Sequence, residues 1–257
     1  MHKQEVINVR PSLVLLSGGA DFQLKIWSLI DGSNPVTLKG HTSASSRDGT
    51  IRLWNCGTAD TIAVVGSYNC SVSKILLAKL PKHIEPADPK ALDEREVDTA
   101  DCMVIAALAD GSARFIHLGT KQELFSATGD DVPLTCIAYD AETEVLVTGD
   151  RQGVVRVFCL SELNAPVVAW QRNEHAVTDI QLKPDEEGSS TLCVANADGS
   201  IYQTGSLDAI LEKKKVQVLA EYSGNELENV RGLRVMASPA GQSRLVSTIE
   251  TGQICLY

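Results

Sequence analysis

The sequence lacks the long apolar run that a membrane-spanning helix requires. Of its 257 residues, 44% are hydrophobic and 22% are charged, and no stretch approaches the roughly 18 apolar residues of a transmembrane segment. The N-terminus, MHKQEVINVRPS, has no apolar stretch after its basic residue, which argues against a secretory signal. These absences predict a soluble protein of the cytoplasm, with the nucleus as the second expected compartment.

Positive charge is also scarce. The 23 Lys and Arg residues are outnumbered by 33 Asp and Glu residues, which gives a formal net charge of -10. Nucleic acids and anionic membranes are bound by basic protein surfaces. The charge balance therefore argues against both as partners and favours a partner protein with a basic surface.

The residue patterns of metal sites and active sites are missing as well. The seven cysteines lie far apart without a C-x-x-C pair, mostly in apolar runs, as small buried hydrophobic residues do. The five histidines show no metal-ligand spacing. The sequence contains no Gly-rich phosphate loop, no G-x-S-x-G motif and no carboxylate pair in an apolar stretch. We therefore expect no enzymatic activity, no metal and no cofactor.

What the sequence does contain is one pattern repeated six times. Each copy is an apolar run, a turn with an acidic residue and often a glycine, and a second apolar run, which is typical of a β-hairpin. Further strand candidates, among them PVTLKG, SVSKILLA, PLTCIAYD and AVTDIQLK, lie between the copies. The six hairpins are predicted at residues 13–29, 43–56, 102–118, 144–160, 191–207 and 243–257.

The spacing of the hairpins predicts a β-propeller. Val, Ile, Leu, Phe and Trp dominate the runs, and Asp-Gly pairs supply the positive φ angles that tight hairpin turns require. The turn acids Asp110, Asp150 and Asp198 follow one another at intervals of 40 and 48 residues, the period of a propeller blade. Four-stranded units at this period pack radially around a channel. The predicted fold is an all-β propeller, with residues 1–257 as a single domain.

Two features predict that this propeller is incomplete. Trp27 and Trp54 are only 27 residues apart, which is too close for a full blade, so we expect strand material to be missing after His41. Neither terminus supplies a clear spare strand to close the ring. We therefore expect six repeats of a seven-bladed parent, one of them incomplete, in an open or strained ring.

The first two repeats resemble WD repeats. The stretch DFQLKIW is followed by KGHT and then by RDGTIRLWN, which are similar to the Gly-His and Trp-Asp ends of that family, with Asn55 in place of the usual Asp. The resemblance implies a hydrogen-bond network inside the blade that joins His41, one of residues 43–46, Asp48 and Trp54. It assigns structural roles to Trp27, Gly40, His41, Asp48, Gly49 and Trp54.

Beyond the generic repeat, the chain resembles the proteasomal ATPase-associated factor family, WD-repeat proteins that act as assembly chaperones of the proteasome regulatory particle. The resemblance over residues 13–106 is carried by LSGGADFQLKIWS with VTLKGH, by SASSRDGTIRLWNCG and by DEREVDTADCMVIA. From Asp110 onward it rests on GDRQGVVRVFCLSELNAPV and on hairpin spacing. It implies binding to proteasomal ATPase subunits during assembly of the particle.

Two acidic segments are candidate contacts for such a partner. Residues 80–101 contain three prolines and seven acidic residues against three basic ones, which predicts a mobile, solvated insertion between blades. The second segment is the turn at residues 129–131. An inert solvated loop is the more frequent outcome for a charge run of this kind. The candidate contact residues are Asp93, Glu94, Glu96, Asp98, Asp130 and Asp131.

Two other functions stay open. One is a different WD-repeat adaptor, such as a substrate receptor of a ubiquitin ligase or a ribosome-assembly scaffold, although neither a linker-binding motif nor a basic face is evident. The other is a small-molecule or hydrolytic site in the propeller channel, which would need convergent polar residues there. We expect short apolar and small side chains in the channel instead. The predicted function is a monomeric, non-catalytic protein-interaction scaffold.

Overall fold

The structure, a computed structural model, describes nine parts of the chain, and for the first three of them the backbone alone. These parts are residues 14–18, 24–28, 36–38, 48–55, 58–96, 98–185, 188–222, 228–237 and 243–257. Nearly all regular elements in them are β-strands, and every described sheet is antiparallel. Each sheet is built from strands that follow one another along the chain.

Three of the six described sheets have four strands. One contains β6 (Val72–Lys79), β7 (Cys102–Leu108), β8 (Ser112–His117) and β9 (Glu123–Thr128). The next contains β10 (Leu134–Asp140), β11 (Val145–Asp150), β12 (Val154–Cys159) and β13 (Val168–Gln171). The third contains β14 (Val177–Pro184), β15 (Ser190–Asn196), β16 (Ile201–Ser206) and β17 (Val218–Tyr222). A short helix, α1 (Leu207–Lys213), connects β16 to β17.

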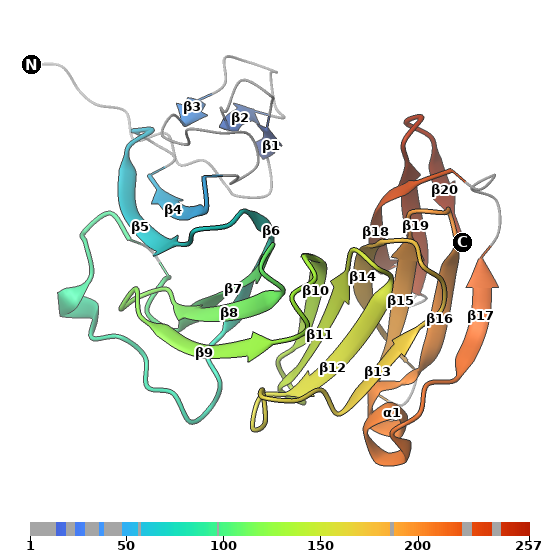
Figure 1. The fold of residues 1–257 in the computed structure, drawn as a ribbon. Helices are drawn as coiled ribbons and strands as arrows, with labels where there is room; N and C mark the ends of the chain where they lie inside the picture. The colour runs from blue at the N-terminus through green and yellow to red at the C-terminus, as the bar shows by residue number, and fades with distance from the viewer. Residues whose placement is uncertain are drawn as a thin grey trace, which may run out of the picture.

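The other three sheets are smaller. The N-terminal sheet contains β1 (Val14–Gly18), β2 (Leu24–Ser28) and β3 (Val36–Leu38). The second contains β4 (Thr50–Trp54) and β5 (Thr61–Ser67). The C-terminal sheet contains β18 (Val230–Ala237), β19 (Ser243–Ile249) and β20 (Ile254–Leu256). Figure 1 shows the six sheets following one another in an arc, with the N-terminal and C-terminal sheets at its two ends.

This arrangement confirms the predicted all-β propeller. Five of the six predicted hairpins appear as antiparallel strand pairs, and the first half of the other, at residues 43–56, lies outside the described residues. The second blade, the shortened one, has two described strands, β4 and β5. In Figure 1 the end sheets stand apart, as expected for an open ring.

The hairpin turns form as the Asp-Gly pairs predict. The carboxylate of Asp110 accepts hydrogen bonds from the N–H and the hydroxyl of Ser112, at 2.9 and 2.7 Å. Gly111 has a φ of +85°, and a Cβ there would lie 2.3 Å from the carbonyl oxygen of Asp130. Only glycine fits this turn without strain. Asp48 and Asp198 cap their turns in the same way.

The core lies between the faces of successive sheets. Phe115 and Met103 of one blade pack with Ile137 and Phe158 of the next, and equivalent apolar clusters fill the next two interfaces. The second blade covers its neighbour less completely. Ile75 and Leu77 pair across β6 and β7 with the buried Ala106 and Val104, yet their own side chains are 53% and 67% exposed. The two strands β4 and β5 thus leave the inner part of this face uncovered.

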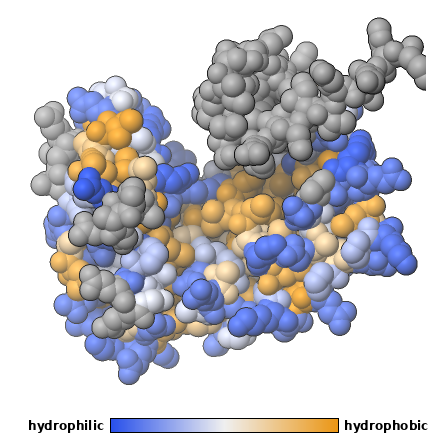
Figure 2. All heavy atoms as spheres, turned by 180° about the vertical axis from the view of Figure 1, so that it is seen from behind, coloured by the Kyte–Doolittle hydropathy of each residue, from blue (hydrophilic) through white to orange (hydrophobic). Residues whose placement is uncertain are grey.

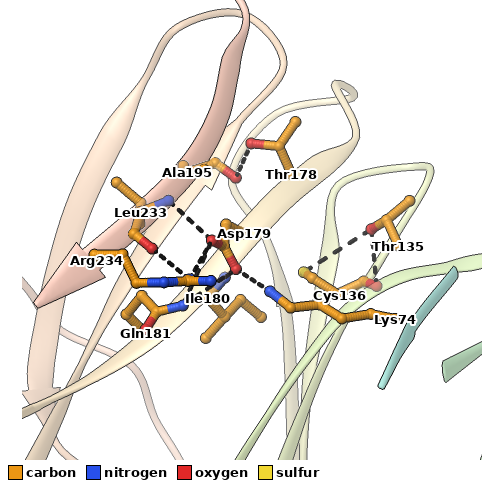
Figure 3. Close-up of polar contacts among 12 residues, drawn as sticks. Lys74, Thr135, Cys136, Thr178, Asp179, Ile180, Gln181, Ala195, Leu233 and Arg234 are labelled. Carbon is orange, nitrogen blue, oxygen red and sulfur yellow. Dashed lines mark hydrogen bonds and ion pairs between the residues drawn. The ribbon is translucent and has the colours of Figure 1, made fainter. Parts of the chain in front are cut away.

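A buried carboxylate ties three blades together near the propeller axis. Asp179 of β14, whose side chain is 5% exposed, forms ion pairs with Lys74 of β6 and, at 3.5 Å, with Arg234 of β18. It also accepts the backbone N–H of Ile180 at 2.9 Å and of Leu233 at 2.8 Å. Figure 3 shows these groups converging on Asp179 from three sheets.

This cluster corrects the expectation of short apolar and small side chains in the channel. In four blades, the pairing of the first strand with the second shifts register near the start of the first strand. These shifts lie at residues 72–74, 134–136, 177–179 and 230–232. A β-bulge changes the direction in which nearby side chains point. Two of these bulges lie directly before Lys74 and Asp179. Lys74 and Asp179 have opposite charges and belong to different blades. Their ion pair therefore holds these two blades together.

Removing the central carboxylate should destabilise the whole ring. We expect Asp179→Ala to lower the free energy of unfolding by about 3–5 kcal/mol, since it leaves Lys74 and two buried N–H groups without their acceptor. Glu221→Gln is the control, because it breaks an exposed pair with Arg172 that should contribute less than about 1 kcal/mol. Urea denaturation measures both, and equal losses would contradict this role of Asp179.

The buried cysteines should be inert in the native protein. Burial raises the pKa of Cys136 to about 12 and that of Cys193 to about 11. At pH 8 the reactive thiolate of Cys136 is then about one part in ten thousand. We expect iodoacetamide to modify the half-buried Cys70, Cys159 and Cys255 first. It should reach Cys136 and Cys193 only in denaturant. Peptide mass spectrometry measures the order, and rapid native labelling of Cys136 would contradict it.

Candidate protein-binding site

The acidic insertion between β6 and β7 has a defined structure. Its two ends are joined by a hydrogen bond from the N–H of Leu80 to the carbonyl of Asp101, and the N–H of Ala87 donates to the carbonyl of Ala100, both at 2.9 Å. Asp88 caps a single 3-10 turn, Pro89–Ala91, by accepting the N–H of Lys90. We expected a mobile, solvated segment from its composition; instead the backbone closes on itself locally.

Two side chains of the hairpin β8–β9 hold the insertion against the blade. The buried His117 accepts the N–H of Gly119 at its Nδ1, 3.1 Å away, and its Nε2 lies 3.3 Å from the carbonyl oxygen of Glu85. Because Nδ1 accepts, the Nε2–H is the donor to Glu85. Lys121 pairs with Glu96 at 2.6 Å. Neither contact is visible in the composition of the insertion itself.

Residues 89–101 of the insertion line an open hollow with a volume of about 730 Å³, which we call the acidic hollow because five carboxylates and one lysine, Lys90, line it. Four of the predicted contact residues come together there, but with different accessibilities. Glu94 and Asp98 are exposed and Asp93 is partly exposed. The side chain of Glu96 is only 5% exposed and is occupied by Lys121 and by the hydroxyl of Thr99. The carboxylates that line the hollow are Asp93, Glu94, Glu96, Asp98 and Asp101.

The charges in the hollow are stabilised locally. Both carboxylate oxygens of Asp93 accept hydrogen bonds from the Arg95 guanidinium, at 2.8 and 2.7 Å. These bonds, with the Arg95 backbone N–H, hold the pKa of Asp93 well below its usual range. A hydrogen bond from Lys79 likewise lowers the pKa of Asp101. Asp93 and Asp101 therefore stay ionised at neutral pH. Each of them is already paired with a cation of this chain.

The remaining two predicted contacts lie elsewhere. Asp130 and Asp131 are exposed in the turn between β9 and β10, outside the hollow. Asp130 pairs at 2.6 Å with Arg156, whose guanidinium also contacts the fully buried carboxylate of Asp150 at 2.6 Å. This pairing gives Asp130 a role in holding two turns of the rim together. The turn offers Asp131 and one face of Asp130 to solvent.

The predicted WD-repeat residues are described in part. Asp48 and Gly49 form the turn before β4, where Asp48 accepts the N–H and hydroxyl of Thr50 at 3.1 and 3.0 Å. Trp54 ends β4, and Trp27 lies in β2, whose backbone alone is described. Gly40, His41 and residues 43–46 lie outside the described residues, so their predicted network stays a prediction.

Sequence reasoning missed the channel cluster of Lys74, Asp179 and Arg234. The sequence feature that could have indicated this cluster is a charged residue inside each of three apolar strands, such as Asp179 in AVTDIQLK. A buried charge has to be paired, but nothing in the sequence says with which partner. Lys74 and Asp179 are 105 residues apart.

Other site types are not seen in the described part of the chain. No group of three or more His, Cys, Asp or Glu residues there is arranged to hold a metal ion. No described helix has the length and hydrophobicity needed to cross a membrane.

Comparisons with known proteins support the repeat assignment. No family model matches the chain. It is 27% identical over 163 residues to Protein ROOT INITIATION DEFECTIVE 3 of Arabidopsis thaliana, covering 56% of this chain and 36% of the relative. It is 25% identical over 195 residues to the serine-threonine kinase receptor-associated protein of Bos taurus, covering 61% of this chain and 55% of the relative.

The chain thus spans between about a third and just over half of the length of these relatives. Both are WD-repeat proteins, and neither bears on the finer resemblance to the proteasomal family. The similarity is distant. Together with the sequence of antiparallel blades, it supports a relationship with WD-repeat proteins and gives the chain the architecture of their β-propeller.

Proposed function

We propose that the protein is a non-catalytic interaction scaffold that binds a basic surface of a partner protein through the acidic hollow. The observation that carries this proposal is the ordered grouping of carboxylates in residues 93–101 on a segment anchored by His117 and Lys121. Anchoring matters because a pre-ordered contact loses less conformational entropy on binding than a flexible loop. Charge complementarity of this kind chiefly raises the association rate and the specificity.

The partner we propose is an ATPase subunit of the proteasome regulatory particle, which the protein would bind as an assembly chaperone. The support for this finer proposal is the resemblance carried by residues 13–106, which includes the end of the insertion, DEREVDTADCMVIA. The acidic balance of the chain, with its net charge of -10, suits a basic partner surface. The distant WD-repeat relatives are compatible with a scaffold role.

Neutralising the exposed acids of the hollow tests the proposal. In Glu94→Gln with Asp98→Asn, the second substitution keeps a residue that tolerates the positive φ of Asp98, 56°. We expect affinity for purified ATPase C-terminal domains to fall about fivefold to tenfold, as the loss of two exposed charge pairs implies. Biolayer interferometry at two salt concentrations measures the change, and the effect should shrink at high salt.

The matched control is Glu142→Gln with Glu174→Gln, which removes the same charge from exposed positions outside the insertion. This variant should bind like the natural protein. If both double variants lose affinity equally, the hollow is not the contact and only net charge matters. If the natural protein shows no salt-sensitive binding to any of the ATPase domains, the proposed partner is wrong.

A further inference from the structure

The C-terminal sheet has two faces of different character. One face packs on the preceding blade, where Leu233, Leu245 and Ile249 join a buried cluster with Ala195 and Ile201. The strand register places alternate residues on the opposite face. Arg234, Val246 and Leu256 lie side by side in one row, and Thr248 lies beside Ile254 in the next. We call this second face the outer C-terminal face.

The outer C-terminal face carries large apolar side chains in water. Met236 is 56% exposed, Ile254 is 72% exposed and Leu256 is 58% exposed. Ile254 and Leu256 are neighbours on β20, whereas Met236 lies two strands away on β18, beside Arg244. Isolated exposed hydrophobic residues are normal, but neighbouring ones such as the pair on β20 mark interaction sites. Figure 2, seen from behind, shows hydrophobic residues on the upper part of the lobe at the left, bordered by hydrophilic ones.

The charge of this face is opposite to that of the chain as a whole. The strands β18, β19 and β20 contain three arginines and no acidic residue. Arg231 pairs with Glu250 of the adjoining turn, and Arg234 reaches Asp179 at 3.5 Å. Arg244, which is exposed and lies opposite Met236, makes no ion pair with any residue that the structure describes. Arg244 is therefore the cation of this face that can meet a carboxylate of a partner.

We propose that the outer C-terminal face binds an amphipathic segment of a partner protein in which acidic residues accompany the apolar ones. The apolar side chains of such a segment would cover Met236, Ile254 and Leu256, and its carboxylates would meet Arg244. A second copy of this chain fits less well, because two such faces would bring their arginines against each other. The proposal is independent of the acidic hollow, which selects a partner of the opposite charge.

Peptide binding tests this proposal directly. The probe is a short fluorescent peptide of Leu, Glu and Ser, and its control is the same peptide with Gln in place of Glu, because a Lys peptide would bind to the acidic hollow. We expect the full chain to bind the Glu peptide about threefold to fivefold more tightly, since one exposed charge pair contributes up to about 1 kcal/mol. Fluorescence anisotropy measures both affinities.

Variants then locate the binding site. Arg244→Glu should reverse the preference between the two peptides, and Ile254→Ser with Leu256→Ser should abolish binding of the Glu peptide. Val218→Ser with Leu219→Ser is the matched control, because it removes two exposed apolar side chains from β17, outside the C-terminal sheet. All five positions are exposed, and unchanged melting temperatures would show that the variants fold.

Three results would overturn the proposal. The first is equal affinity for the Glu and Gln peptides. The second is a loss of Glu-peptide binding in the β17 control as large as that in the β20 variant. The third is sedimentation of the natural protein as a dimer that Ile254→Ser with Leu256→Ser dissociates, since the occupant would then be a second copy.

Discussion

The structure depends on one constraint, which is that each blade is apolar on both faces and so needs a neighbour on each side. The sheets β10–β13 and β14–β17 meet this requirement, and the interfaces among the three four-stranded sheets contain fully buried residues of the core, such as Phe115, Tyr202 and Leu192. Where a neighbour is short or missing among the described strands, apolar side chains reach water. This happens at Ile75 and Leu77 beside the two-stranded blade, and again on the outer C-terminal face.

The parts of the fold that are set by residues close together in the sequence could be predicted from the sequence. Strand runs and Asp-Gly turns are local features, which is why the hairpin containing Asp110 and Gly111 appears where it was expected. The strand β9 and the helix α1 were not predicted. The sequence of β9, ELFSAT, has few apolar residues, and it becomes a strand because β8 offers it an edge to pair with. The helix is too short for its periodicity to be recognised.

The candidate site was predictable in composition but not in arrangement. The acidic character of residues 80–101 is evident from the sequence, whereas their order comes from contacts with His117 and Lys121, which belong to another hairpin. Glu96 shows the difference most clearly. It was grouped with the candidate contacts because of its charge, yet its carboxylate is turned inward and holds the insertion in place. A charge pattern does not distinguish an acid that binds a partner from one that anchors its own loop.

The link from Asp179 to both β6 and β18 has a consequence for how the molecule evolves and how it can be dissected. In solenoid proteins each repeat contacts only its neighbours, so repeats can be added or removed with nearly additive effects on stability. Here an ionic contact joins blades that are not adjacent. Deleting the blade of Asp179 would leave Lys74 and Arg234 without their shared carboxylate, and deleting the blade of Lys74 would leave Asp179 only its 3.5 Å contact with Arg234. This chain is therefore a poor candidate for dissection into autonomous fragments.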